Sequence, residues 1–298
     1  MAESEYGDDN RMDRFQQTRR VALLGISANI FLMILKLLAG FASRSQAMTA
    51  DGFNSAQDVF ASAITLIGNR IASKPEDRDH PYGHGKAEYI FSMIISFSLL
   101  LAGVQILRSS FSSIWNRGEF VFSWWLVAVS AITIILKLWL YRHTAKAGRE
   151  QDNLLITANS LDHRNDVFVT TATLLGILFG TVGLYWIDGV VGIGISGWII
   201  LTGLRIFSGA YHVLMDTSID PAAMKKIRQV IESISGVDHV DDITSKPIGV
   251  GYILIVKVSV KSTLTVLEGH GIAAEIKQRL KHCNNCKIDE VVVHVNPA

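Results

Sequence analysis

Residues 21–43 read VALLGISANIFLMILKLLAGFAS, and this stretch indicates the class of fold. Its only charged residue is Lys36. A helix needs roughly 20 mostly apolar residues to cross the hydrocarbon core of a bilayer. The stretch therefore predicts a helix that spans a membrane.

Five further segments have the length of a spanning helix, and two of them carry polar interruptions. They cover residues 46–72, 89–112, 121–141, 154–181 and 184–208, with the interruptions in 46–72 and 154–181. The chain of 298 residues is 49% hydrophobic and only 18% charged. Because soluble proteins usually carry about 25% charged residues, we expect an integral membrane, α-helical protein with six transmembrane helices.

The residues after position 210 have the composition of an ordinary soluble domain. Asp220 is a favourable N-cap and Pro221 suits the first helical position, so we expect a helix from there to residue 234. Strands are expected at 238–245, 251–260 and 287–295, and a second helix at 265–281. We predict a cytoplasmic N-terminal tail (1–20), a six-helix transmembrane domain (21–213) and a cytosolic αββαβ domain of the ferredoxin or metallochaperone-like α/β type (214–298).

Basic residues in the short loops predict the orientation of the spans, because such residues favour the cytoplasmic side. They gather in the N-terminal tail and in the loops that follow the second and fourth spans: Arg11, Arg14, Arg19, Arg20, Lys74, Arg78, Lys86, Arg142, Lys146 and Arg149. Both termini are therefore expected in the cytoplasm, in a multi-pass protein of the cell membrane. A net charge of +1 without a basic block gives no indication of a nucleic-acid partner.

Two of the spans carry polar residues at helical spacing. One reads DGFNSAQD from residue 51, and the other reads NSLDHRND from residue 159. Asn54 and Asp58 are four residues apart, and so are Asp162 and Asp166, which places each pair on one face of its helix. Two helices that each offer such a pair of oxygen ligands can enclose one metal ion.

The free-energy cost of placing these carboxylates inside a bilayer favours a functional role for them. A carboxylate inside a bilayer costs roughly 2.5–3.5 kcal/mol on insertion scales. Asp58, Asp162 and Asp166 also repel one another, and a bound divalent cation offsets that repulsion, as protons do when the ion is absent. The alternative is that both segments lie on the membrane surface or re-enter it, with solvated aspartates.

Three other polar residues of the spans have less defined roles. Asp51 lies on the face of Asn54 and Asp58, one turn nearer the outer surface, and either lines an exit path or pairs with Lys36. Lys36 and Lys137 lie toward the ends of their predicted spans. We therefore expect both lysines to extend to the membrane interface.

The loop after the second span contains Asp77, His80 and His84, whose ligand types and spacing suit a metal ion. Glycines beside His84 allow a tight backbone turn. The alternative is a solvated polar loop. A weaker candidate is the single CxxC of Cys283 and Cys286, which fits an exposed turn in a reduced, cytosolic domain at least as well as a zinc site.

Three motifs carry a resemblance to a known family. They are the quartet of Asn54, Asp58, Asp162 and Asp166, the stretch HPYGHGKAE from residue 80, and LMDTSID from residue 214. Over nearly its whole length the chain resembles the cation diffusion facilitator family, and in particular its bacterial manganese exporters. The resemblance implies a homodimer that exchanges a divalent metal ion for protons across the lipid bilayer by alternating access.

The resemblance also assigns roles to residues. It places the transport site on the quartet, the loop site on Asp77, His80 and His84, and a charge interlock at the dimer's membrane–cytosol junction on Lys86 and Asp216. The cytosolic site of the zinc-type members is matched only at His270 and His294, with Asp241, Val256 and Asn296 at its other positions. We therefore expect the zinc site of this domain to be degraded, with Asp241, His270 and His294 as its candidate metal ligands.

The ligand types of the quartet favour a hard cation. It offers one amide and three carboxylates, whereas zinc-type members of the family usually place a histidine there. Oxygen ligands suit Mn²⁺, and the lack of imidazole avoids favouring Zn²⁺, which binds more tightly in the Irving–Williams order. We therefore expect Mn²⁺ as the transported ion, with Fe²⁺ or Zn²⁺ as alternatives, and no resident cofactor. Mg²⁺ is less suited because it retains its waters.

Two other classes of function compete with transport. A membrane metalloenzyme would need a catalytic base, and His163 is available, but it lies one position off the face of Asp162 and Asp166 and no HExxH motif accompanies it. A metal-sensing receptor would use the soluble domain as sensor. Acidic residues on two separate spans favour the passage of an ion, so we expect a transporter and not an enzyme.

Overall fold

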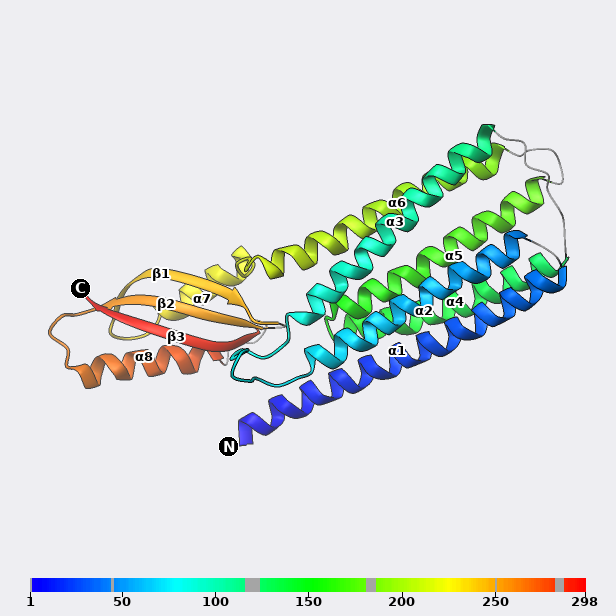
Figure 1. The fold of residues 1–298 in the computed structure, drawn as a ribbon. Coiled ribbons are helices and arrows are strands. Elements are labelled where there is room, and N and C mark those ends of the chain that lie inside the picture. The colour runs from blue at the N-terminus through cyan, green and yellow to red at the C-terminus, as the bar shows by residue number, and fades with distance from the viewer. Residues whose placement is uncertain (1, 44–45, 116–123, 181–185, 250, 282–286) are drawn as a thin grey trace. The chain divides into compact units, whose positions relative to one another are not determined.

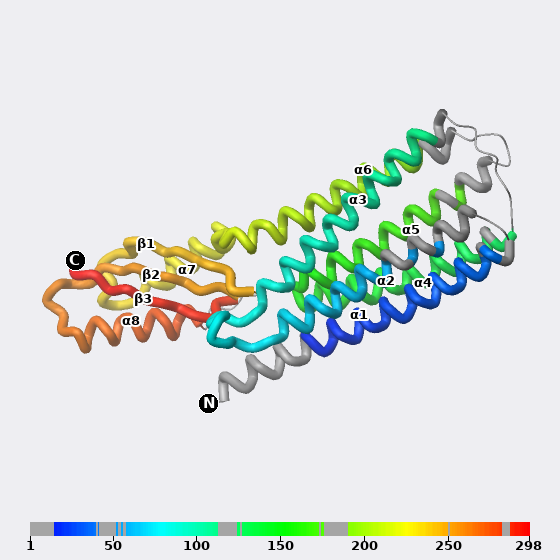
Figure 2. The backbone as a smooth tube through the Cα atoms, in the orientation of Figure 1, coloured from blue at the N-terminus to red at the C-terminus, as the bar shows by residue number. Residues whose placement is uncertain are grey.

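The computed structural model describes residues 2–43, 46–115, 124–180, 186–249, 251–281 and 287–298 (Figure 1). Figure 2 traces the same backbone as a smooth tube. The chain forms two compact units. One unit holds Met1–Lys74 and Ala87–Tyr211, and the other holds Pro75–Lys86 and His212–Ala298. The units divide between Tyr211 and His212, and the loop of residues 75–86 belongs to the C-terminal unit because its contacts lie there. The expected domain boundaries at residues 20 and 213 stay predictions.

Long helices make up the first unit (Figure 1). They are α1 (Ala2–Ser43), α2 (Gln46–Ala72), α3 (Ala87–Trp115), α4 (Trp124–Glu150), α5 (Leu154–Gly180) and α6 (Trp186–Leu214). Helices α1 and α2 lie side by side, as do α4 and α5, and α2 also contacts α5. The helices that carry the predicted acids, α2 and α5, are therefore neighbours.

Two helices extend furthest beyond the ends that the apolar pattern predicts. Residues 2–20, expected as a tail, continue α1, and α4 runs nine residues beyond the predicted end at residue 141. No proline precedes Pro75, so nothing in the first segment interrupts a helix where its apolar run stops. Hydropathy marks the part of a helix that suits a bilayer, but the helix itself continues beyond that part.

In this unit apolar side chains are exposed and polar side chains are buried, which is the reverse of a soluble domain. Large apolar side chains such as Phe31, Leu101 and Ile135 are exposed, whereas Asn29, Asp58 and other polar residues are buried. Exposed apolar surface on this scale is typical of contact with lipid, and buried polar residues are typical of a functional interior. Three helices of the described chain meet the length and composition of a span by themselves: Phe15–Ala39, Ala87–Ser112 and Val190–Leu214.

The second unit is a small mixed sheet covered by two helices. Its elements are α7 (Pro221–Glu232), β1 (Val237–Pro247), β2 (Tyr252–Val260), α8 (Val266–Lys281) and β3 (Ile288–Pro297). The sheet order is β1-β2-β3, with β1 antiparallel and β3 parallel to β2. Leu254, Val256 and Val258 alternate on the buried face of β2 and share one core with Ile231 of α7 and Ile276 of α8.

Side-chain caps define where both of these helices begin. The Asp220 carboxylate accepts hydrogen bonds from the backbone N–H groups of Ala222 and Ala223, with Pro221 at the first helical position. At α8, Thr265 and Glu268 form a reciprocal capping box, in which each side chain accepts from the other residue's backbone N–H. The predicted starts of the two helices are therefore set by local sequence.

Candidate metal sites

The predicted quartet is divided between α2 and α5. Asp58 is buried in the middle of α2, and Asp162 and Asp166 lie one turn apart on α5 with limited exposure. Asn54 belongs to α2, but its side chain lies outside the described part of the chain, as does that of Asp51.

Two buried polar side chains position the helix that carries Asp162 and Asp166. Asn153 caps α5, since its side-chain oxygen accepts a hydrogen bond of 2.9 Å from the backbone N–H of Ile156. The carboxylate of Glu88, at the start of α3, accepts from the N–H of Leu154 at 2.9 Å. A carboxylate at a helix N-terminus is favoured by the free N–H groups and the helix dipole. The beginning of α5 is thus fixed against α3.

A lysine from a third helix joins the two acidic faces. The ammonium of Lys137, on α4, lies 2.8 Å from Oδ2 of Asp58 and 2.6 Å from Oδ2 of Asp166. Its side chain is only 1% exposed. The expectation that Lys137 extends to the membrane interface is wrong, because α4 continues to Glu150 and places this lysine at the centre of the helix. Lys36 is buried as well.

Several buried polar atoms of α5 lack hydrogen-bond partners among the described residues. They are both side-chain amide atoms of Asn159 and of Asn165, Oδ2 of Asp162, both ring nitrogens of His163 and Nε of Arg164. Buried polar groups are nearly always paired in folded proteins, so such a series requires explanation by water or a bound ion. One stretch of α5 therefore has unused ligand capacity beside the Asp58–Asp166 pair.

His163, which the sequence offers as a catalytic base but places one position off the face of Asp162 and Asp166, lies close to these acids. One ligand atom each of Asp162, His163 and Asp166 falls within 4.8 Å of the others, and the His163 side chain is fully buried. Residues one position apart on a helix differ in direction by about 100°, which long side chains can overcome.

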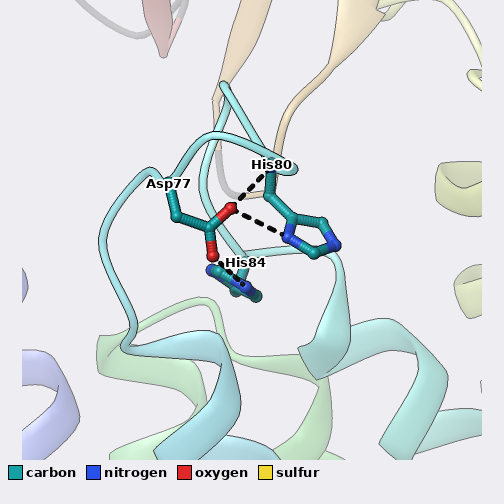
Figure 3. A group of neighbouring side chains, drawn as sticks. All are labelled: Asp77, His80 and His84. Atoms are coloured by element: carbon teal, nitrogen blue, oxygen red, sulfur yellow. Dashed lines mark hydrogen bonds and ion pairs between the residues drawn. The ribbon is translucent and has the colours of Figure 1, made fainter.

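The loop candidate is assembled in the second unit (Figure 3). Asp77, His80 and His84 bring one ligand atom each to within 4.8 Å of the others. Oδ1 of Asp77 accepts hydrogen bonds from the backbone N–H groups of His80 (2.7 Å) and Asp79 (3.0 Å), which closes the turn. The bond from the His80 backbone is the main reason that the pKa of Asp77 lies below its ordinary value of 3.8. The loop thus offers a carboxylate already oriented and ionised.

The histidine orientations also suit metal binding. Nδ1 of His84 lies 3.2 Å from the carbonyl oxygen of Pro75. A carbonyl can only accept a hydrogen bond, so Nδ1 carries a proton, and in the neutral ring the lone pair is on Nε2, which lies 3.4 Å from Oδ2 of Asp77. A histidine whose second nitrogen donates to a carbonyl is the usual arrangement of a metal ligand.

The predicted charge pair, Lys86 with Asp216, is formed within one chain at 2.5 Å. Lys246 lies 3.3 Å from the other carboxylate oxygen of Asp216. Asp216 follows α6 with φ of 55°, and the N–H groups of Asp216 and Thr217 bond the carbonyls of Val213 and His212. This arrangement is a Schellman cap, which usually has glycine at the left-handed position. Asp216 therefore caps α6 through its backbone and binds Lys86 and Lys246 through its carboxylate.

The cytosolic candidates are dispersed. Asp241 lies on β1, His270 on α8 and His294 on β3, and among the described residues they do not form a group within metal-binding distance. The carboxylate of Asp241 is already occupied by Ser259 (3.0 Å), Asn296 (2.9 Å) and His239 (3.0 Å). Cys283 and Cys286 lie outside the described residues.

Sequence reasoning missed Lys137 and underrated His163. A signal for Lys137 exists, because it stands alone in the apolar run IILKLWL, where a buried ammonium needs an acidic partner. For His163, the signal in the sequence is its position next to Asp162, but helical geometry alone does not show that its ring lies beside both acids.

Comparisons with known proteins agree with this arrangement of helices and soluble domain. Residues 22–215 match the model of the cation efflux transmembrane domain, and residues 219–298 match that of the cation efflux protein cytoplasmic domain. The chain is 35% identical to the manganese efflux system protein MneS of Bacillus subtilis (strain 168) over 290 residues, covering 96% of this chain and 98% of that protein. It is 32% identical to MneP, also a manganese efflux system protein of that strain, over 292 residues with the same coverage. It is 28% identical to metal tolerance protein C1 of Arabidopsis thaliana over 298 residues, which cover 95% of this chain and 63% of that protein. The resemblance to cation diffusion facilitators is confirmed: this chain is a membrane protein that belongs to the cation efflux family.

Proposed function

We propose that this protein exports Mn²⁺ from the cell in exchange for protons, through a site formed by Asn54, Asp58, Asp162 and Asp166. The observation that carries the proposal is that the carboxylates of Asp58 on α2 and Asp166 on α5 converge on one buried ammonium, that of Lys137. Unpartnered polar atoms of α5 lie in the same region of that helix. Acids buried between neighbouring helices in a lipid-exposed unit mark an ion path.

All six long helices cross the bilayer in this proposal, with both termini in the cytoplasm. Helices α2, α4 and α5 do not reach the composition of a span, because they carry the polar residues that face the interior of the unit. Their lipid-facing positions include Phe60, Ile135 and Phe168, which are exposed. Polar interior faces lower the mean hydropathy of a helix without preventing it from spanning.

The choice of Mn²⁺ rests on ligand chemistry and on the relatives. Three carboxylates and an amide form an all-oxygen set, which suits hard cations. MneS and MneP are named as manganese efflux proteins. His163 lies near this set, and as a ligand it would favour Fe²⁺ or Zn²⁺, which remain the alternatives.

The exchange follows from what the carboxylates can bind. In the state open to the cytoplasm, Asp58, Asp162 and Asp166 hold the divalent ion as carboxylates. When the helices rearrange and the outer side opens, protons bind the same oxygens and the ion leaves. The metal is the cargo, and no covalent chemistry is needed, so we propose a transporter without enzymatic activity.

A second metal site is proposed on the loop, at Asp77, His80 and His84. Its preformed carboxylate and the oriented lone pair of His84 support it. Two imidazoles and one carboxylate form a more nitrogen-rich set than the proposed transport site, so this loop would bind Zn²⁺ more readily than Mn²⁺.

We further propose that the protein acts as a homodimer and that Lys86 and Asp216 stabilise the junction between its membrane and cytosolic parts. The match of residues 219–298 to the cytoplasmic domain of cation efflux proteins supports the assembly. The ion pair between Lys86 and Asp216, 2.5 Å long within one chain, supports the choice of these two residues.

The decisive experiment is metal flux into proteoliposomes. Asp58→Ala and Asp162→Ala should each reduce Mn²⁺ flux to the level of empty vesicles, because each removes a carboxylate ligand. Glu150→Ala is the control, since Glu150 is an exposed acid at the end of α4 and should leave flux unchanged. Undiminished flux in either aspartate variant would refute the assigned site.

A further inference from the structure

The group nearest the proposed transport site is not a metal ligand but a cation of the protein itself. Lys137 bonds Oδ2 of Asp58 and Oδ2 of Asp166, so its ammonium bridges α2 and α5 from α4. Its side chain is 1% exposed, so water does not take the place of these two partners. The two oxygens that Lys137 binds belong to the two acids that would hold an ion between the helices.

A buried ammonium and a buried carboxylate each lose hydration that only an opposite charge replaces. Lys137 therefore stabilises Asp58 and Asp166 close together when no metal is bound. A divalent ion placed between the same carboxylates would meet the ammonium at short range, where like charges repel strongly because little water separates them. The lysine and the ion cannot both hold these oxygens at full strength.

We propose that Lys137 is a tethered cation that competes with the transported metal ion for Asp58 and Asp166. The inference rests on the proposed transport site. To bind, the divalent ion displaces the ammonium from both carboxylates, and to leave, it is replaced by the returning ammonium. The lysine remains charged throughout, so its role requires movement of the side chain and not transfer of a proton.

This competition has two consequences for transport. It weakens metal binding, so the ion is not trapped in the site and can be released on the far side. It also selects for charge, because a monovalent cation gains less from the carboxylates than a divalent one and displaces the ammonium less readily. Lys137 would thus determine specificity without being a ligand.

Three substitutions at position 137 separate charge from packing. Lys137→Met removes the charge and retains an unbranched side chain, Lys137→Gln is neutral but still donates hydrogen bonds, and Lys137→Arg retains the charge. The control is Lys146→Met, since Lys146 is an exposed lysine of α4 whose ion pair is with Glu150 on the same helix, at 3.8 Å. Mn²⁺ binding is measured by calorimetry on the purified full chain in detergent, and Mn²⁺ flux is measured in proteoliposomes.

Competition predicts that neutral variants bind the metal more tightly and release it more slowly. The dissociation constant for Mn²⁺ should fall by about tenfold or more in Lys137→Met and Lys137→Gln, while flux at saturating Mn²⁺ decreases. Lys137→Arg and Lys146→Met should bind Mn²⁺ as weakly as the unchanged protein.

A final experiment tests whether a free ammonium ion can take the place of the Lys137 side chain. In Lys137→Ala, added n-butylammonium should raise the apparent dissociation constant for Mn²⁺ by several fold, and it should have no such effect on the unchanged protein.

Other outcomes overturn the proposal. Unchanged or weaker Mn²⁺ binding in a folded neutral variant would show that Lys137 does not compete with the ion. If Lys137→Arg folds and every neutral variant fails to fold, Lys137 is a structural counter-ion only. Should Asp58→Ala and Asp162→Ala retain full flux, the transport site itself is wrong, whereas their loss of flux together with unchanged Lys137→Met affinity refutes the competition alone.

Discussion

Gly85 and Gly249 lie backbone to backbone in the C-terminal unit. A Cβ added to Gly85 would lie 3.1 Å from the Cα of Gly249, and one added to Gly249 would lie 3.2 Å from the Cα of Gly85. This contact holds the loop of residues 75–86 against the turn between β1 and β2. It places the loop that bears Asp77, His80 and His84 on the soluble unit, although the sequence places that loop between two apolar helices.

Gly249→Ala should destabilise the C-terminal unit. Gly249 has φ of 99°, which side chains with a Cβ rarely adopt, and the new methyl would press on Gly85. The free energy of unfolding of this unit should decrease by about 1–3 kcal/mol. The measurement is urea unfolding of the full chain in detergent, followed by amide exchange of the β2 strand. Gly271→Ala is the control, because Gly271 lies in α8 with no atom within 4 Å of the added methyl. It should stabilise by about 0.5–1 kcal/mol, and equal effects of the two variants would contradict the steric argument.

Asp77→Asn should weaken metal binding at the loop while keeping its turn. The amide oxygen of asparagine can still accept from the N–H groups of His80 and Asp79, but the negative ligand is lost. Affinity for Zn²⁺ at this site should decrease by about tenfold or more, measured by calorimetric titration of the full chain. Asp79→Asn, outside the three-residue group, is the control and should bind as before. Equal Zn²⁺ affinity in Asp77→Asn would remove Asp77 from the site.

Asn54→His should shift selectivity toward zinc. Replacing an amide by an imidazole adds the ligand type that Zn²⁺ prefers over Mn²⁺. The ratio of Zn²⁺ to Mn²⁺ flux in proteoliposomes should rise on the order of tenfold, equivalent to about 1.4 kcal/mol. Asn54→Asp retains an all-oxygen set and should keep the preference for Mn²⁺. A ratio that does not change in Asn54→His would argue against Asn54 as a ligand.

The Lys86–Asp216 pair should contribute to stability at neutral pH and be lost in acid. The pKa of Asp216 lies below its ordinary value of 3.8, mainly because its carboxylate accepts a hydrogen bond from Lys86 and, to a lesser degree, because Lys246 lies beside it. A carboxyl whose folded-state pKa is lowered stabilises fully above the unfolded-state value and loses this effect as pH falls through the folded-state value. The pair is partly exposed, so it contributes only about 0.2–1 kcal/mol.

The measurement is amide exchange of β2 in the full chain, corrected for the intrinsic rate at each pH. Asp216→Asn should exchange faster than the unchanged protein by less than about fivefold at pH 5–8, and the difference should decrease as the pH falls below about 4 and the Asp216 carboxylate is protonated. A difference that persists in acid would show that the variant acts through the backbone cap and not through the charge.

The elements of the fold were largely predictable because their signals are local. Apolar runs indicate α1 to α6, and the caps at Asp220 and Thr265 set the starts of α7 and α8. The helix ends were less predictable. An apolar run ends where the edge of a bilayer is expected, whereas the backbone hydrogen bonds of α4 continue to Glu150. For that reason Lys137 was expected near a span end and lies at a helix centre.

Sequence by itself determined the family, the spacing that puts Asp162 and Asp166 on one face, and the loop triad, since each depends on residues a few positions apart. Only the tertiary structure decided which distant residues meet. Lys137 reaches Asp58 across 79 positions, and Gly85 meets Gly249. The Asp241 carboxylate accepts hydrogen bonds from Ser259 and Asn296, and among the described residues it forms no metal-binding group with His270 and His294. The reason is physical: helical and strand periods fix directions within an element, whereas contacts between elements depend on packing of the whole chain.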